Sequence, residues 1–257
     1  MNTLAQTRAM SQRSVLALVR QPALVIPSAV FPLFFAALGT SSFSRAVTIP
    51  GFPEVDSFLD FALAGAIVQG ILFGSITSAT ALATDIETGF FDRLLAAPTQ
   101  RTAILIGRLA GAMAYGFAQT LFFVAVLVPF GLRITTGAVG LMLMAIGGLL
   151  TALAVGALMS TMALRTGSSE AVQGSFPLLF VLLFFSSAFF PRETMSGAYR
   201  RIADWNPVSY LVEGFRSLTI GDVNATSIAQ VVALPAALAV VTMTGALAAL
   251  AARTRRG

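Results

Sequence analysis

The sequence contains no cysteine and no histidine, and its 16 basic residues are all arginine. These absences exclude disulfides, zinc sites built on Cys or His, haem held by His or Cys, and catalysis by a His or Cys side chain. Without lysine the chain also lacks a G-x-x-x-x-G-K-[ST] phosphate-binding loop, so it cannot hydrolyse ATP by that route. We therefore expect no catalytic residue, no metal site and no cofactor held by this chain.

Charged residues are also scarce, because they make up 11% of the sequence against 56% hydrophobic residues. Six stretches, each at least 21 residues long, contain no Asp, Glu or Arg. A helix of about 20 apolar residues crosses the hydrocarbon core of a bilayer. The sequence therefore predicts an all-α membrane protein, a single transmembrane domain over residues 1–257 with six spans. The expected spans are about 22–40, 60–83, 104–129, 138–164, 171–190 and 227–251.

The arginines at the ends of these spans predict the orientation of the chain. If the N-terminus is cytoplasmic, ten arginines lie on the cytoplasmic side and six lie outside. Cytoplasmic loops are enriched in basic residues, so we expect both termini to be cytoplasmic. Abundant Arg, Ala and Gly without Lys indicate a GC-rich bacterial genome and hence a bacterial cytoplasmic membrane. The net charge of +5 then reports topology, and we expect no nucleic-acid partner.

Two further features concern how helices meet the membrane interface and one another. Residues 1–20 combine arginines with apolar residues, a pattern compatible with a helix that lies in the cytoplasmic interface. Gly70 and Gly74 in the second span form a small-xxx-small pair that lets another helix approach closely. That neighbour is either another helix of the same chain or a helix of a second subunit.

Residues 84–108 place an apolar row among charged residues on the cytoplasmic side. A short amphipathic helix stopped by Pro98 would hold this row on a surface. Either a protein partner or the lipid headgroup region would then cover it. The apolar row is Phe90, Phe91, Leu94 and Leu95. The charged residues that frame it are Asp85, Glu87, Asp92, Arg93 and Arg101.

Two patterns mark the second half of the chain. Phe176, Phe180 and Phe184 lie at intervals of four in the fifth span and form one stripe on a helix. The stripe either packs against lipid and neighbouring helices or lines a cavity. Glu213 and Arg216, ahead of the sixth span, are close enough in sequence to form an ion pair on one helical turn.

Two polar signatures resemble the membrane subunits of type-2 ABC exporters, and above all the daunorubicin-resistance permease branch. The resemblance covers nearly the whole chain. The first signature consists of Glu87, Gly89, Leu94, Leu95, Pro98, Arg101, Gly107 and Arg108. The second consists of Asn206, Pro207, Tyr210, Glu213 and Arg216.

The resemblance implies a permease subunit of an ATP-driven exporter that moves a hydrophobic or amphipathic substrate out of the cell. It implies that residues 1–20 form an elbow helix and that the loop between spans 2 and 3 forms a coupling helix. Two such subunits pair with two copies of a separate ATPase subunit, which holds the ATP and Mg. The expected partners are thus the ATPase, a second copy of this chain and membrane lipid. The implied docking residues are Asp85, Glu87, Gly89, Phe90, Phe91, Asp92, Arg93, Leu94, Leu95, Pro98 and Arg101.

The resemblance also implies a substrate pathway between spans 2 and 5, which adds Gln69 and Phe73 to the phenylalanine stripe. Short re-entrant helices before the last span are expected to close its outer end, with Asn206, Pro207, Tyr210, Glu213 and Arg216 as gate residues. The first alternative is a gradient-driven secondary transporter or channel, although no carboxylate lies within a span to relay protons. The second alternative is an intramembrane enzyme, in which a Ser nucleophile would have no evident base.

Overall fold

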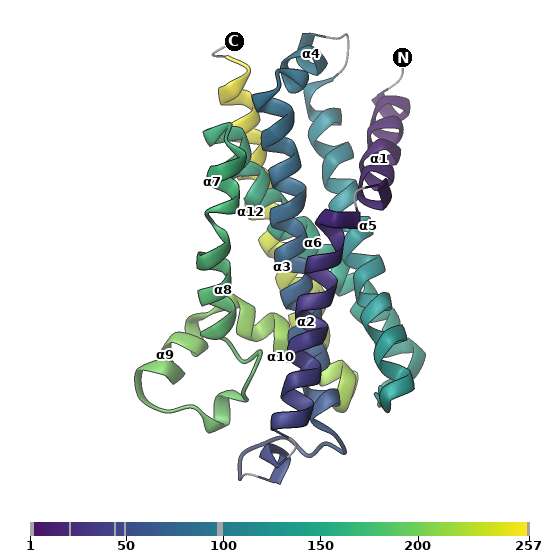
Figure 1. Ribbon diagram of the computed structural model, residues 1–257, viewed down its shortest axis with the longest axis vertical. Helices are drawn as coiled ribbons and strands as arrows, with labels where there is room; N and C mark the ends of the chain where they lie inside the picture. Colours follow the sequence, from purple (N-terminus) through teal and green to yellow (C-terminus); the bar gives the residue numbers. More distant parts are fainter. Residues whose placement is uncertain (1–2, 21, 44, 49, 97–99, 256–257) are drawn as a thin grey trace.

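The computed structural model describes residues 3–20, 22–43, 45–48, 50–96 and 100–255, and every regular element in these ranges is helical (Figure 1). Pro98, expected to end the loop helix, lies outside the described residues. The α-helices are α1 (Thr3–Arg20), α2 (Pro22–Ser42), α3 (Phe58–Glu87), α4 (Phe90–Ala96), α5 (Arg101–Leu127), α6 (Gly137–Thr166), α7 (Ser169–Gln173), α8 (Phe176–Phe184), α9 (Gly197–Trp205), α10 (Pro207–Ile220), α11 (Ala225–Ile228) and α12 (Leu234–Arg253). The 3₁₀ segments are η1 (Ala46–Thr48), η2 (Val128–Phe130) and η3 (Arg192–Thr194), and η4 (Ala229–Ala233) is π-helical.

Within the described ranges, four helices are long and apolar enough to cross a membrane: Phe58–Glu87, Arg101–Phe130, Gly137–Thr166 and Ala225–Arg253. The first of these, Phe58–Glu87, is α3, and it stands at the centre of the bundle. In its most apolar stretch 94% of the residues are buried, against 22% for the helix that ends the chain. A helix that is apolar on all faces is buried in this way, whereas the outer helices leave apolar side chains for lipid.

The first and fifth predicted spans form shorter apolar helices. Helix α2 carries Pro27 and Pro32 inside it. The fifth span, predicted as one helix over 171–190, is divided into α7 and α8 and ends at Phe184. Pro177 in the first turn of α8 has no N–H to donate to the preceding turn. The Ser175 hydroxyl donates to the carbonyl of Val172 (2.6 Å) at the break.

Small residues bring the long helices together. A Cβ atom on Gly70 would meet the Gln119 side chain, and one on Gly74 would meet the ring of Tyr115, both on α5. The close neighbour of this glycine pair is therefore a helix of the same chain. Gly148 on α6 likewise packs directly against the backbone of α5, so α5 and α6 also approach closely at a small residue.

Helix α1 packs along α5 near the end of the molecule that carries α4. Gly107 of α5 contacts Met10, and Gly111 contacts Ser14, so two glycines one turn apart accommodate α1. Helix α1 begins, and α12 ends, at the same end of the bundle as α4 (Figure 1). Helices α7 and α8 stand on the other side of α3 from α5 (Figure 1).

Candidate functional site

Helix α4 forms where the sequence predicts an amphipathic helix, but its apolar row does not lie entirely on the surface. Gly89, with φ of +68°, makes the sharp turn between α3 and α4. Phe91 is only 2% exposed and belongs to a core cluster shared with α3, α5, α7 and α12. Leu94 and Leu95 are half-buried against the same cluster. The expectation that the whole apolar row lies on the surface is therefore wrong at Phe91, because the helix buries one face against the core, and docking through α4 stays a prediction.

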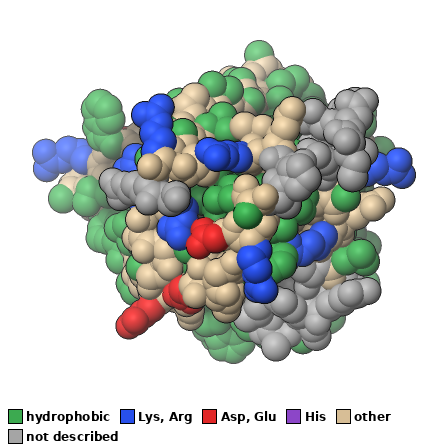
Figure 2. Space-filling view, turned by 90° about the horizontal axis from the view of Figure 1, so that it is seen from above, with side chains coloured by type: hydrophobic (Ala, Val, Ile, Leu, Met, Phe, Trp, Pro, Cys, Tyr) green, Lys and Arg blue, Asp and Glu red, His purple; other side chains and the backbone are tan. Residues whose placement is uncertain are grey.

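The accessible face of α4 is mainly charged. Asp92, Arg93 and, at the start of α5, Arg101 are exposed. The ring of Phe90 is half-buried and lies beneath the guanidinium groups of Arg13 (4.4 Å from the ring centroid) and Arg93 (5.7 Å). Seen from this end, arginines dominate the charged side chains (Figure 2).

Asp85, at the end of α3, joins three helices. Its carboxylate accepts a hydrogen bond from Arg108 of α5 (2.6 Å) and lies 3.8 Å from Arg13 of α1. The arginine at position 108 is largely buried, so this pair is more than a surface contact. The ion pairs of Asp85 thus connect α1, α3 and α5 next to α4.

Glu87, the last residue of α3, binds the start of α7. The backbone N–H of Ser169 donates to Oε1 of Glu87 (2.6 Å), and the Ser169 hydroxyl donates to Oε2 (2.9 Å). A carboxylate is favoured at a helix start because it meets backbone N–H groups that lack partners in the helix. Both carboxylate oxygens of Glu87 are therefore used within the chain.

The phenylalanine stripe of α8 forms a continuous line of rings with α2 and α3. Phe73 of α3 lies 4.8 Å from Phe176 and 6.2 Å from Phe180, measured between ring centroids. Phe180 lies 4.6 Å from Phe184. Phe31 of α2, which the sequence analysis did not single out, lies 5.9 Å from Phe73 and 6.3 Å from Phe180. Nothing in the uniformly apolar sequence of α2 distinguishes Phe31 from its neighbours.

Two cavities lie along this line, and we call them the near and the far cavity by their distance from α4 along α3. The near cavity, of about 490 Å³, is lined by Phe31, Phe73 and Phe176, and its polar lining residues are Ser28, Thr77, Thr80 and Gln173. The far cavity, of about 220 Å³, has mostly apolar walls, and Gln69 of α3 is a polar residue in its lining. Its other lining residues include Phe35, Ala188, Phe184, Phe189 and Tyr199.

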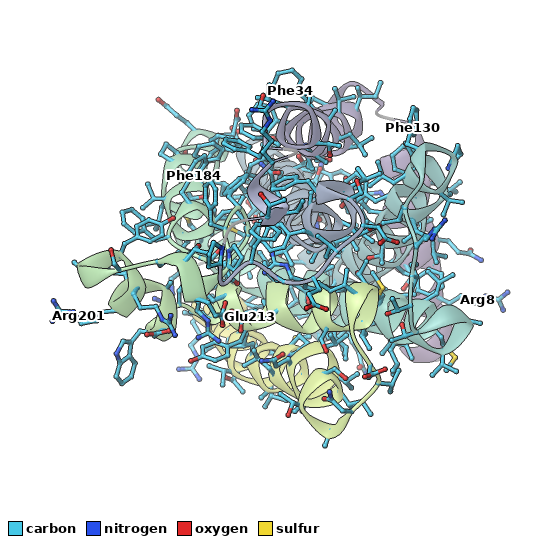
Figure 3. The ribbon with its side chains drawn as sticks, turned by 90° about the horizontal axis from the view of Figure 1, so that it is seen from below. Arg8, Phe34, Phe130, Phe184, Arg201 and Glu213 are labelled. Atoms are coloured by element: carbon cyan, nitrogen blue, oxygen red, sulfur yellow. The ribbon has the colours of Figure 1, made fainter. Side chains whose placement is uncertain are left out.

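The rings of Phe31, Phe73 and Phe180 contact one another, and we call these three residues the aromatic triad. Phe31 and Phe73 are also walls of the near cavity, whereas Phe180 lines neither cavity. Phe176 and Phe184, the neighbours of Phe180 on the stripe, line the near and the far cavity respectively. Seen from the end opposite α4, Phe184 lies on the side of the bundle away from Phe130 (Figure 3). Gln69 is 2% exposed, and its Nε2 has no hydrogen-bond partner among the described residues.

The prediction of an ion pair between Glu213 and Arg216 is wrong. Glu213 of α10 instead forms a two-pronged pair with Arg192 of η3, in which Nε donates to Oε1 (2.5 Å) and Nη2 donates to Oε2. The Arg192 guanidinium also lies 4.7 Å from the ring centroid of Tyr210. Burial opposes the charge of Arg192, but the hydrogen bonds to Glu213 and the negative charge of that carboxylate outweigh burial and raise the pKa of Arg192 above the ordinary value. In the view from the end opposite α4, Glu213 lies within the outline of the molecule (Figure 3).

Arg216 forms no salt bridge with Glu213 among the described residues, and it is buried. Its guanidinium lies 3.7 Å from the ring centroid of Phe61 at the start of α3. Its Nη2 donates to the carbonyl of Ser187 (2.7 Å), just beyond α8. Nδ2 of Asn206 donates to the carbonyls of Leu182 (2.6 Å) and Phe185 (2.9 Å) at the end of α8. Four of the five predicted gate residues hold elements together; the exposed Pro207 only begins α10.

Comparison with known proteins places these features in a family. Residues 5–220 match the ABC-2 type transporter family. A daunorubicin resistance ABC transporter permease protein of Streptomyces coeruleorubidus is 30% identical over 237 residues, and the match covers 89% of this chain and 80% of the relative. A probable doxorubicin resistance ABC transporter permease protein of Mycobacterium tuberculosis is 24% identical over 218 residues, 84% of this chain and 78% of the relative.

A third relative gives a similar result. A putative transport permease of Pyropia yezoensis is 30% identical over 225 residues, and the match covers 83% of this chain and 73% of the relative. The match extends over α1 to α10, and with the long apolar helices it identifies a multi-pass membrane protein. The chain therefore belongs to the ABC-2 type transporter family, as a membrane permease.

Proposed function

We propose that this chain is the transmembrane subunit of an ATP-driven exporter for hydrophobic or amphipathic molecules. The observation that carries the proposal is α4, a short helix that presents Asp92 and Arg93 at the arginine-rich end of the molecule. A charged, exposed face on a helix whose other face is anchored in the core suits docking of a soluble partner. Because the chain has no phosphate-binding loop, that partner supplies ATP hydrolysis and holds the ATP and Mg.

The proposed assembly contains two copies of this chain and two ATPase subunits in a bacterial cytoplasmic membrane. Six spans, formed by α2, α3, α5, α6, the α7 to α8 pair and the α11 to α12 helix, would put both termini in the cytoplasm. The common position of α4 and of the two terminal helices at one end of the bundle supports this topology (Figure 1). Helix α1 is the proposed elbow helix and α4 the proposed coupling helix.

The proposed substrate pathway follows the near cavity, the aromatic triad and the far cavity. Aromatic walls with a few polar groups suit a flat, apolar molecule with polar substituents. Two relatives are named for resistance to daunorubicin and doxorubicin, which supports a substrate of this kind. Movement of α4 on ATP binding would separate the rings of the triad and connect the cavities.

The test is to purify the chain from its native host in mild detergent, identify co-purifying proteins and measure ATP hydrolysis with and without daunorubicin. We expect an ATPase subunit in about equal amount, and hydrolysis that rises with the drug. A folded chain that purifies alone, and that transports a substrate along an ion gradient without ATP, would refute the proposal and favour a secondary transporter.

A further inference from the structure

Helix α8, which carries the phenylalanine stripe, leaves apolar side chains without cover on one side. On α8, Leu178 is 63% exposed and Val181 is 50% exposed. One side of α8 meets the rings of Phe31 and Phe73, and the other side has no cover within the described residues. An element with so few buried contacts is free to move as a unit if its ends allow it.

Polar side chains hold the end of α8 that is far from α4. Asn206 donates to the carbonyls of Leu182 and Phe185, and Arg216 donates to the carbonyl of Ser187. The Ser187 hydroxyl in turn donates to the carbonyl of Ser209 (3.0 Å). These bonds satisfy carbonyls that a helix end leaves without partners. They fix this end of the stripe to α10.

At the other end, the carboxylate of Glu87 holds the first residue of α7 through two charge-assisted hydrogen bonds to Ser169. Glu87 is also the last residue of α3 and lies three residues before Phe90, where α4 begins. Gly89 between them has no atom within 4 Å of the place where a Cβ would lie, so the joint is open. Glu87 is thus the point at which α3, α4 and α7 meet.

We propose that Glu87 is a positioning residue that passes displacement of α4 to α7 and α8, and so sets the aromatic triad. This inference rests on the proposed function, and it gives Glu87 a role different from docking the ATPase. If α4 moves, the end of α3 moves with it, and the two bonds draw Ser169 along. Because the far end of α8 is fixed by Asn206 and Arg216, α7 and α8 pivot, and Phe180 leaves Phe31 and Phe73.

The experiment compares Glu87→Ala, Glu87→Gln and Ser169→Ala with a matched control, Glu170→Gln. Glu170 is the next carboxylate on α7, and its side chain makes no hydrogen bond to α3 in the described part of the chain. The reporter is Trp fluorescence from Phe176→Trp in a Trp205→Phe background, since Trp205 is the only tryptophan. Each assembly with the ATPase subunit, reconstituted in vesicles, receives Mg with ATP or with a non-hydrolysable ATP analogue.

We expect the wild type and Glu170→Gln to show an emission change on nucleotide binding. In Glu87→Ala the ATPase subunit should co-purify as in the wild type, while the emission change and the ratio of drug transported to ATP hydrolysed fall roughly tenfold. Ser169→Ala should fall in the same direction and Glu87→Gln should be intermediate, because an amide oxygen still accepts one bond.

Two results would overturn the inference. If Glu87→Ala loses the ATPase subunit but Ser169→Ala behaves as the wild type, then Glu87 is a docking residue. If Glu87→Ala keeps the full emission change, α7 does not follow α4 through this contact. A wild type that neither binds an ATPase nor responds to nucleotide would instead refute the proposed function itself.

Discussion

Arg216 shows how a single charge is accommodated in this molecule. It is 5% exposed and forms no salt bridge among the described residues. The ring of Phe61 and the carbonyls of Ser187 and Ala188 take the place of a carboxylate. Removing a buried, bonded charge leaves its partners unsatisfied, whereas exposed charges contribute little.

We therefore expect Arg216→Ala to destabilise the protein by roughly 2–4 kcal/mol, a value typical of broken buried polar networks. Arg216→Lys should recover only part of this loss, because an ammonium group does not stack on Phe61 in the manner of a planar guanidinium. Thermal unfolding of the purified variants in one detergent checks this order. Arg201→Ala, at an exposed position on α9, serves as the control and should unfold as the wild type does.

At the scale of elements, α4 has one face in the core and one face in solvent, and the two faces should respond differently to substitution. Phe91→Asp would place a charge in the cluster around α3 and α7. We expect loss of folded protein in the membrane, measured as monodisperse yield after extraction. Arg93→Glu reverses a charge on the exposed face, so it should leave the yield unchanged and reduce co-purification of the ATPase about tenfold.

Leu94 and Leu95 belong to the buried side of α4, so substitutions at these positions would not test docking alone. Both are half-buried against the core, so an Asp at either position would disturb folding as well as binding. Binding that survives Arg93→Glu at full strength would show that α4 docks nothing through this face.

The aromatic triad belongs to three elements, α2, α3 and α8, and its removal should change selectivity more than stability. Under the proposed function, we expect Phe180→Ala to join the near and far cavities and to raise the KM for drug-stimulated ATP hydrolysis about tenfold, because the proposed pathway loses an aromatic ring. Phe34→Ala, a change of the same size at a 56% exposed position of α2, is the control. Equal KM values for the two variants would contradict a pathway along the triad.

At the scale of the whole molecule, α4, the start of α1 and the end of α12 lie at one end, and α9 and α10 lie in the opposite half (Figure 1). The absence of cysteine provides a direct test, because any cysteine introduced is the only one. In intact cells, a maleimide that cannot cross membranes should label Arg133→Cys and Arg201→Cys but not Asp92→Cys. Asp92→Cys should become labelled once the cells are disrupted. The opposite labelling pattern would invert the proposed topology.

Parts of this architecture could be predicted from the sequence and parts could not. The apolar stretches and the short helix α4 follow from local composition, and the long helices and α4 appear at the expected places. The burial of Phe91 could not be predicted, since the sequence gives an amphipathic row without showing which side of α4 meets α3. The pairing of Glu213 was predicted wrongly, because sequence spacing favours Arg216 while the fold brings Arg192 closer.

The sequence by itself determined that this is an α-helical membrane protein without thiol, imidazole or lysine chemistry. Partition of a helix into a bilayer depends on the summed hydrophobicity of about 20 consecutive residues, a property that can be read along the chain. Only the tertiary structure decided which groups meet: Glu87 with Ser169, Glu213 with Arg192, and Phe31 with Phe73 and Phe180. Hydrogen bonds, ion pairs and ring contacts act over a few ångströms, so they depend on how distant segments pack rather than on local composition.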